Sequence, residues 1–299
     1  MIQGKEICKS FDGFLALDHA SFHVPKGSVY GLVGSNGAGK STLLRHAAGI
    51  FKQDSGELLV DGEPVFENNK VKERMAFIPD DVFYFRQASV LDMKKYYEGI
   101  YPKFDGALFQ IMRDCFTGLD FKLPIRRMSK GMQKQAAFLL AISMRPELLL
   151  LDEPVDGLDP VIRRQVWSIL MGEVEKGDMT VWISSHNLRE LEDVCDYVGI
   201  MHKGKIILER SLTELQGSVT KLQVAFEGET PDMAGDLDIL HDTALGRVHT
   251  MIIRGNREEV QQKVQRYYPL LVDMVPLNLE EIFIYELGGE DYAVKDILL

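Results

Sequence analysis

The sequence has no long hydrophobic run. Uncharged stretches such as Ser28–Gly39 and Gln135–Met144 fall well short of the roughly 20 consecutive apolar residues that a membrane-spanning helix needs. The first residues, Met1–Glu6, do not form the apolar core of a signal peptide. We therefore expect the chain to be cytoplasmic and to meet a membrane only through a partner protein.

The sequence is also poor in cysteine and in positive charge. Its three cysteines, Cys8, Cys115 and Cys195, are isolated and odd in number, so they have neither metal-ligand spacing nor the pattern of a disulfide framework. The formal net charge is −11, whereas proteins that bind nucleic acid usually present a basic surface. We therefore expect no nucleic-acid partner, although a local basic patch within an acidic total would be compatible with one.

A glycine-rich segment matches the phosphate-loop pattern G-x-x-x-x-G-K-[ST] at every fixed position. It lies between an apolar strand, Ser28–Val33, and a helix, Lys40–Ala48, and its glycines let successive backbone N–H groups point at phosphate oxygens. The predicted nucleotide-binding residues are Gly34, Ser35, Asn36, Gly37, Ala38, Gly39, Lys40, Ser41 and Thr42. Lys40 would reach the β- and γ-phosphates, Ser41 would coordinate Mg²⁺, and Thr42 would contact the α-phosphate. The segment therefore predicts binding of ATP with Mg²⁺.

Two acids follow a run of four leucines, Leu148–Leu151. Such a run predicts a buried strand, and open α/β sheets bind ligands at the carboxyl ends of their strands. Asp152 is placed to hold Mg²⁺, and Glu153 to take a proton from an attacking water. Many strands end in solvated acids, so the pair alone is weak evidence for a catalytic site. The phosphate loop upstream makes that interpretation much stronger.

Further motifs resemble those of one family, the nucleotide-binding subunits of ABC transporters. The segment Met128–Gln133 is similar to the family signature Leu-Ser-Gly-Gly-Gln, and Asp156–Pro160 matches the D-loop. His186 ends an apolar strand at the position of the switch histidine, and Phe11 precedes the phosphate loop where the family has an aromatic residue that stacks on adenine. The order and spacing of these motifs agree with the family from Met1 to about Gly217.

The resemblance implies that hydrolysis takes place in a head-to-tail dimer with a second ATPase subunit, identical or paralogous. In the family, the signature of one subunit closes over the ATP of the other, and the switch histidine contacts the γ-phosphate. The corresponding residues here are Ser129, Lys130, Gly131 and Met132 for the signature, Asp159 for contact across the interface, and His186 for catalysis with Glu153 and Lys40. Taken alone, Ser129 would be an ordinary helix N-cap, His186 a loop histidine, and Phe11 a core residue.

Two positions depart from the family pattern. Asp80 stands after the strand Met75–Ile78 where the family usually has a glutamine that touches Mg²⁺, so Asp80 is a candidate metal ligand of shorter reach. Lys130 and Met132 replace the usual signature residues. Both features resemble separate-chain ATPases of bacterial exporters, which implies a transmembrane permease partner, export, and a peripheral location on the inner face of the cell membrane.

The expected fold is α/β: a P-loop NTPase core with a mainly parallel sheet and an antiparallel β subdomain, a helical subdomain, and a small C-terminal α+β appendage. We place the ATPase domain at 1–217, its helical subdomain at about 83–145, and the accessory domain at 218–299. Within the accessory domain, Asn278–Phe283 is similar to a short motif of such exporter subunits. The alternative function is a soluble ATPase of the same family that acts on nucleic acid or the ribosome, although no second cassette or long coiled coil is present in this sequence.

Overall fold

The computed structural model describes residues 1–228 and 230–287. Two compact units divide the chain: an N-terminal unit of residues 1–186 and 194–209, and a C-terminal unit of residues 187–193 and 210–299. The sequence placed this division at 217. Among the described residues, no helix is both long and apolar enough to cross a bilayer.

The N-terminal unit is built on two sheets. Its strands are β1 (Ile2–Phe11), β2 (Phe14–Val24), β3 (Val29–Val33), β4 (Ser55–Val60), β5 (Glu63–Pro64), β6 (Met75–Ile78), β7 (Leu148–Asp152), β8 (Thr180–Ser185), β9 (Tyr197–His202) and β10 (Lys205–Ser211). Its helices are α1 (Lys40–Ala47), α2 (Asn69–Lys72), α3 (Val90–Ile100), α4 (Gly106–Cys115), α5 (Lys130–Ser143) and α6 (Pro160–Glu175), with a 3₁₀ turn η1 (Ile125–Arg127).

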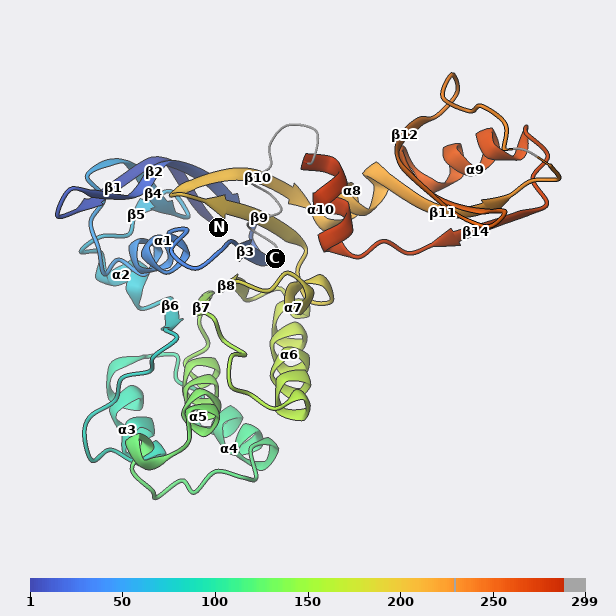
Figure 1. The fold of residues 1–299 in the computed structure, drawn as a ribbon. Coiled ribbons are helices and arrows are strands. Elements are labelled where there is room, and N and C mark those ends of the chain that lie inside the picture. The colour runs from blue at the N-terminus through green and yellow to red at the C-terminus, as the bar shows by residue number, and fades with distance from the viewer. Residues whose placement is uncertain (229, 288–299) are drawn as a thin grey trace. The chain divides into compact units, whose positions relative to one another are not determined.

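The larger sheet has the strand order β10-β9-β3-β8-β7-β6 and can be followed across Figure 1. The pairs β9–β3, β3–β8, β8–β7 and β7–β6 are all parallel. Every residue of β3, β7 and β8 is buried, as continuous apolar runs in a parallel sheet require. Because the chain enters α1 directly after β3 and the acidic pair follows β7, both functional segments lie at the carboxyl edge of this sheet.

The smaller sheet is antiparallel, in the order β2-β1-β4-β5. Its buried side chains join those of β3, α1 and β7 in one hydrophobic core, in which Leu17, Leu43 and Trp182 are fully buried. The expected parallel core and antiparallel subdomain are therefore confirmed. Phe11 is the last residue of β1 and pairs with Phe14 across the hairpin turn.

Helices α3, α4 and α5 gather in one region between β6 and β7 (Figure 1). Their starts follow from capping residues in the sequence, since a side-chain oxygen before a helix satisfies its free N–H groups. Ser89 forms a capping box with Asp92 at α3, Asp105 caps α4, and Ser129 caps α5 through the N–H of Met132. The predicted cap at Ser129 is thus confirmed.

The C-terminal unit contains a second antiparallel sheet in the order β12-β13-β11-β14. Its elements are α7 (Arg189–Glu192), α8 (Leu212–Ser218), β11 (Val219–Ala225), β12 (Asp238–Leu245), β13 (Val248–Arg254), α9 (Arg257–Gln265), β14 (Leu271–Val275) and α10 (Leu279–Leu287). Its core includes Leu222, Met251, Ile253, Val260 and Val264. The side chain of Phe283 and residues 288–299 of the predicted accessory domain lie outside the described residues.

Candidate functional site

The phosphate loop turns sharply between β3 and α1 because two glycines permit it. Gly39 has a φ of 109° directly before α1, a conformation that L side chains rarely adopt. A Cβ on Gly34 would lie 2.3 Å from the backbone oxygen of Met201, so only glycine fits where the loop passes β9. The loop therefore has the compact form that the sequence pattern predicts.

Lys40 lies inside this loop with its side chain only 5% exposed. Its ammonium donates to the carbonyl oxygens of Gly34 at 2.6 Å and Ser35 at 3.3 Å, and it lies 3.5 Å from Oε1 of Glu153. Burial lowers the pKa of Lys40, and the nearby carboxylates of Glu153 and Asp152 partly offset this effect. A cation held among carbonyls at a helix N-terminus is well placed for phosphate.

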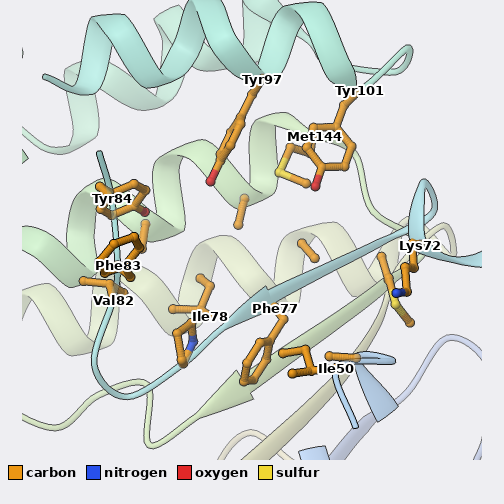
Figure 2. Close-up of a pocket in the computed structure, with 16 residues that line it drawn as sticks. Ile50, Lys72, Phe77, Ile78, Val82, Phe83, Tyr84, Tyr97, Tyr101 and Met144 are labelled. Carbon is orange, nitrogen blue, oxygen red and sulfur yellow. The ribbon is translucent and has the colours of Figure 1, made fainter. Parts of the chain in front are cut away.

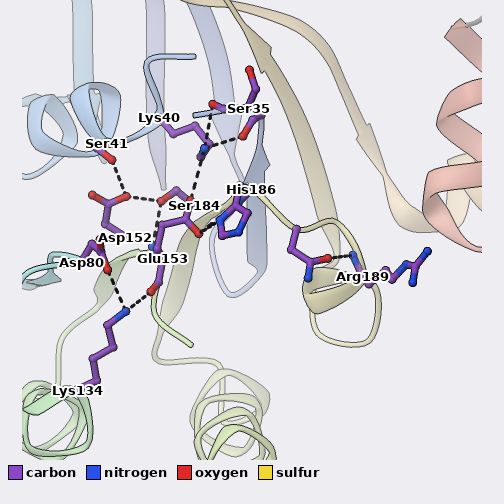
Figure 3. Close-up of polar contacts among 12 residues, drawn as sticks. Ser35, Lys40, Ser41, Asp80, Lys134, Asp152, Glu153, Ser184, His186 and Arg189 are labelled. Atoms are coloured by element: carbon purple, nitrogen blue, oxygen red, sulfur yellow. Dashed lines mark hydrogen bonds and ion pairs between the residues drawn. The ribbon is translucent and has the colours of Figure 1, made fainter. Parts of the chain in front are cut away.

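Asp152 is almost fully buried at the end of β7. Its Oδ1 accepts hydrogen bonds from the hydroxyl of Ser41 at 2.9 Å and from that of Ser184 at 2.6 Å. The two predicted metal ligands of the phosphate loop and β7 are therefore in contact, as Figure 3 shows. Hydroxyl and carboxylate oxygens are the donors that Mg²⁺ prefers, so this pair fits that ion.

Glu153 sits on a strained backbone, with a φ of 46°, in the left-handed region that is unfavourable for non-glycine residues. Its N–H donates to the carbonyl of Ser184 at 3.1 Å. Its Oε2 lies 2.9 Å from Nδ1 of His186 and accepts from the His186 N–H at 3.3 Å. The structure thus brings the predicted base and the predicted switch histidine together (Figure 3).

Lys40, Ser41 and Glu153 border one cavity of about 340 Å³, whereas Asp152 and His186 are not among its described lining residues. It is lined by Phe14, Ala16, Asn36, Gly37, Gly39, Lys40, Ser41, Thr42, Asp80 and Glu153. Phe14, which is 67% exposed, was not predicted, and it occupies the cavity wall where Phe11 was expected. Phe11 instead contacts Phe51 edge to face, with ring centroids 5.3 Å apart. Its stacking on adenine stays a prediction, and Phe14 becomes the second aromatic candidate.

The predicted signature residues begin α5, and none of them is among the described residues that line this cavity. Gly131 lies against the D-loop, because a Cβ there would be 2.9 Å from the carbonyl oxygen of Gly157. Lys130 is 83% exposed, and its Nζ lies 3.7 Å from a carboxylate oxygen of Asp81. Asp159 caps α6 by accepting from the N–H groups of Val161 and Ile162.

Sequence reasoning also missed Lys134, on the second turn of α5. Its Nζ donates to the main-chain carbonyl of Glu153 at 2.6 Å and to Oδ1 of Asp80 at 3.1 Å. Asp80 therefore lies at the rim of the cavity beside a lysine. The sequence around Lys134 gives little signal, because this residue stands between two glutamines just before the apolar run Ala136–Ile142.

The chain is similar to known ATP-binding proteins of one transporter family. Residues 17–156 match the family described as "ABC transporter". The chain is 31% identical to the ABC transporter ATP-binding protein YtrB of Bacillus subtilis, over 97% of this chain and 99% of that protein. It is 30% identical to the lantibiotic transport ATP-binding protein SrtF of Streptococcus pyogenes, over 70% and 90%.

The fold is shared with solved cassettes. A dimeric structure of MJ0796, described as a bacterial ABC transporter cassette, superposes with a TM-score of 0.64 at 19% identity, over 71% of this chain and 99% of that one. The near full-length match to YtrB and the assembled phosphate site lead to one identification. The chain belongs to the ABC transporter family, in which it is an ATP-binding subunit that hydrolyses ATP.

Proposed function

We propose that two such subunits pair head to tail around two ATP molecules and drive a separate transmembrane permease. The observation that carries the pairing is the position of the signature. The cavity beside Lys40 and Glu153 is lined by the phosphate loop and Asp80, whereas none of the signature residues at the start of α5 is among its described lining residues. A helix N-terminus attracts anions, so the signature of one subunit is suited to the γ-phosphate held by another.

Within each site, Lys40 binds the β- and γ-phosphates, and Ser41 and Asp152 hold Mg²⁺. Bound there, the ion would supply positive charge that stabilises the phosphate oxygens. Glu153 accepts the proton of the attacking water, and His186 holds the Glu153 carboxylate through its 2.9 Å contact. As the family resemblance implies, His186 would also contact the γ-phosphate. Asp80, at the cavity rim, is a further candidate ligand whose carboxylate is shared with Lys134.

A second surface supports the permease partner. A largely apolar cavity of about 330 Å³ lies between β6 and helices α3 and α5. Figure 2 shows Tyr97 of α3 and Tyr101, which directly follows α3, facing Phe77 and Ile78 of β6 across it. Phe83 lines this groove although its side chain is 80% exposed, and Tyr84 lines it as a buried residue. An amphipathic cytosolic helix of the permease would cover such a groove.

Phe85 is not among the described residues that line this groove, and its ring packs against Tyr96 at a centroid distance of 5.1 Å. Docking through this groove would place the subunit on the inner face of the cell membrane. The proposed direction is export, from the resemblance at Asp80, Lys130 and Met132 to exporter ATPases, and the relative SrtF is named for lantibiotic transport.

The test of the site is Glu153→Gln, which keeps the shape and removes the base. We expect turnover to fall by about 10²–10⁴-fold, the usual contribution of a general base, while ATP still binds. Light scattering should then detect an ATP-dependent dimer. Glu175→Gln, on the exposed end of α6, is the matched control and should hydrolyse ATP normally. Unchanged turnover in Glu153→Gln would remove Glu153 as the base, and a monomer in ATP would remove the pairing.

The test of the groove uses two neighbouring phenylalanines. Phe83→Asp introduces a charge into the groove, and Phe85→Asp introduces the same charge next to it. We expect an integral membrane protein to co-purify with the native chain and with Phe85→Asp from detergent-solubilised membranes, but not with Phe83→Asp. Equal recovery with both variants would count against this groove, and no co-purifying membrane protein with the native chain would count against the permease.

A further inference from the structure

Lys134 is a buried cation outside the motifs described above. Its side chain is only 4% exposed, and it precedes a stretch of α5 in which Ala136, Ala137 and Phe138 are buried. Removing an ammonium group from water costs several kcal/mol unless good partners compensate. An apolar residue would fill the same space without that cost, so the contacts that Lys134 makes must compensate for its burial.

Those contacts join three segments of the N-terminal unit. Lys134 comes from the signature helix α5, Asp80 from the loop after β6, and Glu153 from the end of β7. Figure 3 shows the lysine reaching up from α5 between the two acidic residues. The 3.1 Å contact with the Asp80 carboxylate is an ion pair, and the 2.6 Å contact is a charge-assisted hydrogen bond to the Glu153 carbonyl.

The carbonyl contact matters because of the backbone at Glu153. A residue with a φ of 46° persists only where its surroundings hold it in place. On one side of Glu153, the N–H is bound by the carbonyl of Ser184. On the other side, the carbonyl accepts from Lys134. The Glu153 carboxylate points toward Lys40 and His186. Its direction therefore depends on Lys134, which contacts the main chain of Glu153 and not its carboxylate.

We propose that Lys134 is a positioning residue for ATP hydrolysis: it holds the backbone of Glu153 so that the carboxylate faces the phosphate site, and Asp80 is its counterion. The proposal rests on the role of Glu153 as the base. It also gives a physical role to the acid at position 80, since the pair of Asp80 and Lys134 ties the loop after β6 to the base. A neutral glutamine at position 80 would leave the buried ammonium without that charge.

The experiment compares Lys134→Met with Lys176→Met. Methionine fills the volume of lysine but cannot donate, and Lys176 is a surface lysine paired with Glu173 on α6. Because a misplacement of about 1 Å near the chemistry can cost about 10²-fold, we expect kcat of Lys134→Met to fall by about 10- to 100-fold. The KM for ATP should change far less, since the phosphate loop is intact. Lys176→Met should match the native chain.

Two further variants distinguish positioning of Glu153 by Lys134 from a general loss of folding. Lys134→Gln keeps a donor for the carbonyl of Glu153 but not the charge, so it should recover part of the lost kcat. In the Glu153→Gln background, Lys134→Met should lower kcat little further. A residue that acts only by positioning the base has no effect once the base has been removed. Thermal unfolding and affinity for an ATP analogue show that each variant is folded.

The outcomes distinguish this proposal from the one on which it rests. Turnover that survives Glu153→Gln overturns both. Turnover lost in Glu153→Gln but unchanged in Lys134→Met overturns only the positioning role. If kcat falls equally in Lys134→Met and Lys134→Gln, the hydrogen bond to the Glu153 carbonyl is not what positions the base. The same conclusion follows if only the KM for ATP changes. If Lys134→Met fails to fold, Lys134→Gln is compared with the native chain instead. A native kcat in Lys134→Gln would then overturn the proposal.

Discussion

The two units of this protein differ in whether charged side chains are buried. In the N-terminal unit, Lys40, Lys134 and Asp152 are all buried at the carboxyl edge of the parallel sheet. In the C-terminal unit, no Asp, Glu, Lys or Arg is buried among the residues that the structure describes. Since a buried charge is costly unless it is paired, the first arrangement indicates chemistry and the second indicates packing.

Sheet topology explains the difference. Parallel strands deliver their following segments to one edge, so the phosphate loop, Asp152 and His186 converge after β3, β7 and β8. The antiparallel sheet of the C-terminal unit has no such shared edge, and its charged pairs, such as Lys221 with Glu281 and Arg254 with Asp238, are partly or fully exposed. Changes in the C-terminal unit should therefore alter stability, and changes at the parallel edge should alter nucleotide binding and turnover.

The largest expected effect is a core change in the C-terminal unit. Leu222 of β11 is fully buried in its core, so Leu222→Ala should lower the free energy of unfolding of this unit by about 2–5 kcal/mol. Urea unfolding followed by circular dichroism measures this. Leu245→Ala is the control, because Leu245 is 87% exposed on β12. If folded Leu222→Ala also binds an ATP analogue more weakly, the C-terminal unit affects nucleotide binding. The contrast between the two units would then be wrong.

The next effect belongs to the phosphate loop. Lys40→Met should weaken affinity for a fluorescent ATP analogue by about 10- to 100-fold, because hydrogen bonds to charged groups contribute about 1.5–3 kcal/mol. The matched control is Lys221→Met, which removes a lysine paired with Glu281 in the C-terminal unit and should leave the affinity unchanged. Equal losses in both variants would show that nucleotide binding is not confined to the parallel edge.

The same contrast explains which features could be predicted from sequence. The phosphate loop, the Asp152–Glu153 pair and the cap at Ser129 depend on local patterns: glycines at fixed spacing, an apolar run that ends in acids, and a serine before a helix. Lys134 and Phe14 were missed because their roles depend on contacts between segments far apart in the chain. Nothing local indicates that Lys134 reaches the carbonyl of Glu153.

Part of the C-terminal fold was missed for another reason. The strand β12 was not predicted because its residues, Asp238–Leu245, are mostly exposed and carry no regular alternation of apolar and polar side chains. It lies at the edge of the sheet, where only one neighbour is needed to complete its pairing. By contrast, β11 alternates buried and half-buried residues over most of its length, which is the pattern of a strand with one face in a core.

The smallest effect tests a helix cap next to one of the points where the chain passes from one unit to the other. The helix α10 begins with a capping box: the N–H of Glu281 donates to Oδ1 of Asn278 at 2.8 Å, and the N–H of Asn278 donates to Glu281 at 3.1 Å. The next N–H, that of Leu279, donates to Glu192 of α7, and α7 begins three residues after His186 in the sequence. Asn278→Ala should cost about 1 kcal/mol of unfolding free energy in the C-terminal unit.

Asn278→Asp should restore that stability, because aspartate caps helices as well as asparagine does. If the C-terminal unit only packs, both variants should hydrolyse ATP at the native rate, measured below the temperature at which either begins to unfold. A lower kcat in Asn278→Ala that Asn278→Asp restores would break the contrast between the units. It would mean that the cap on α10 acts through α7 on the segment that carries His186, and that the C-terminal unit contributes to catalysis as well as to packing.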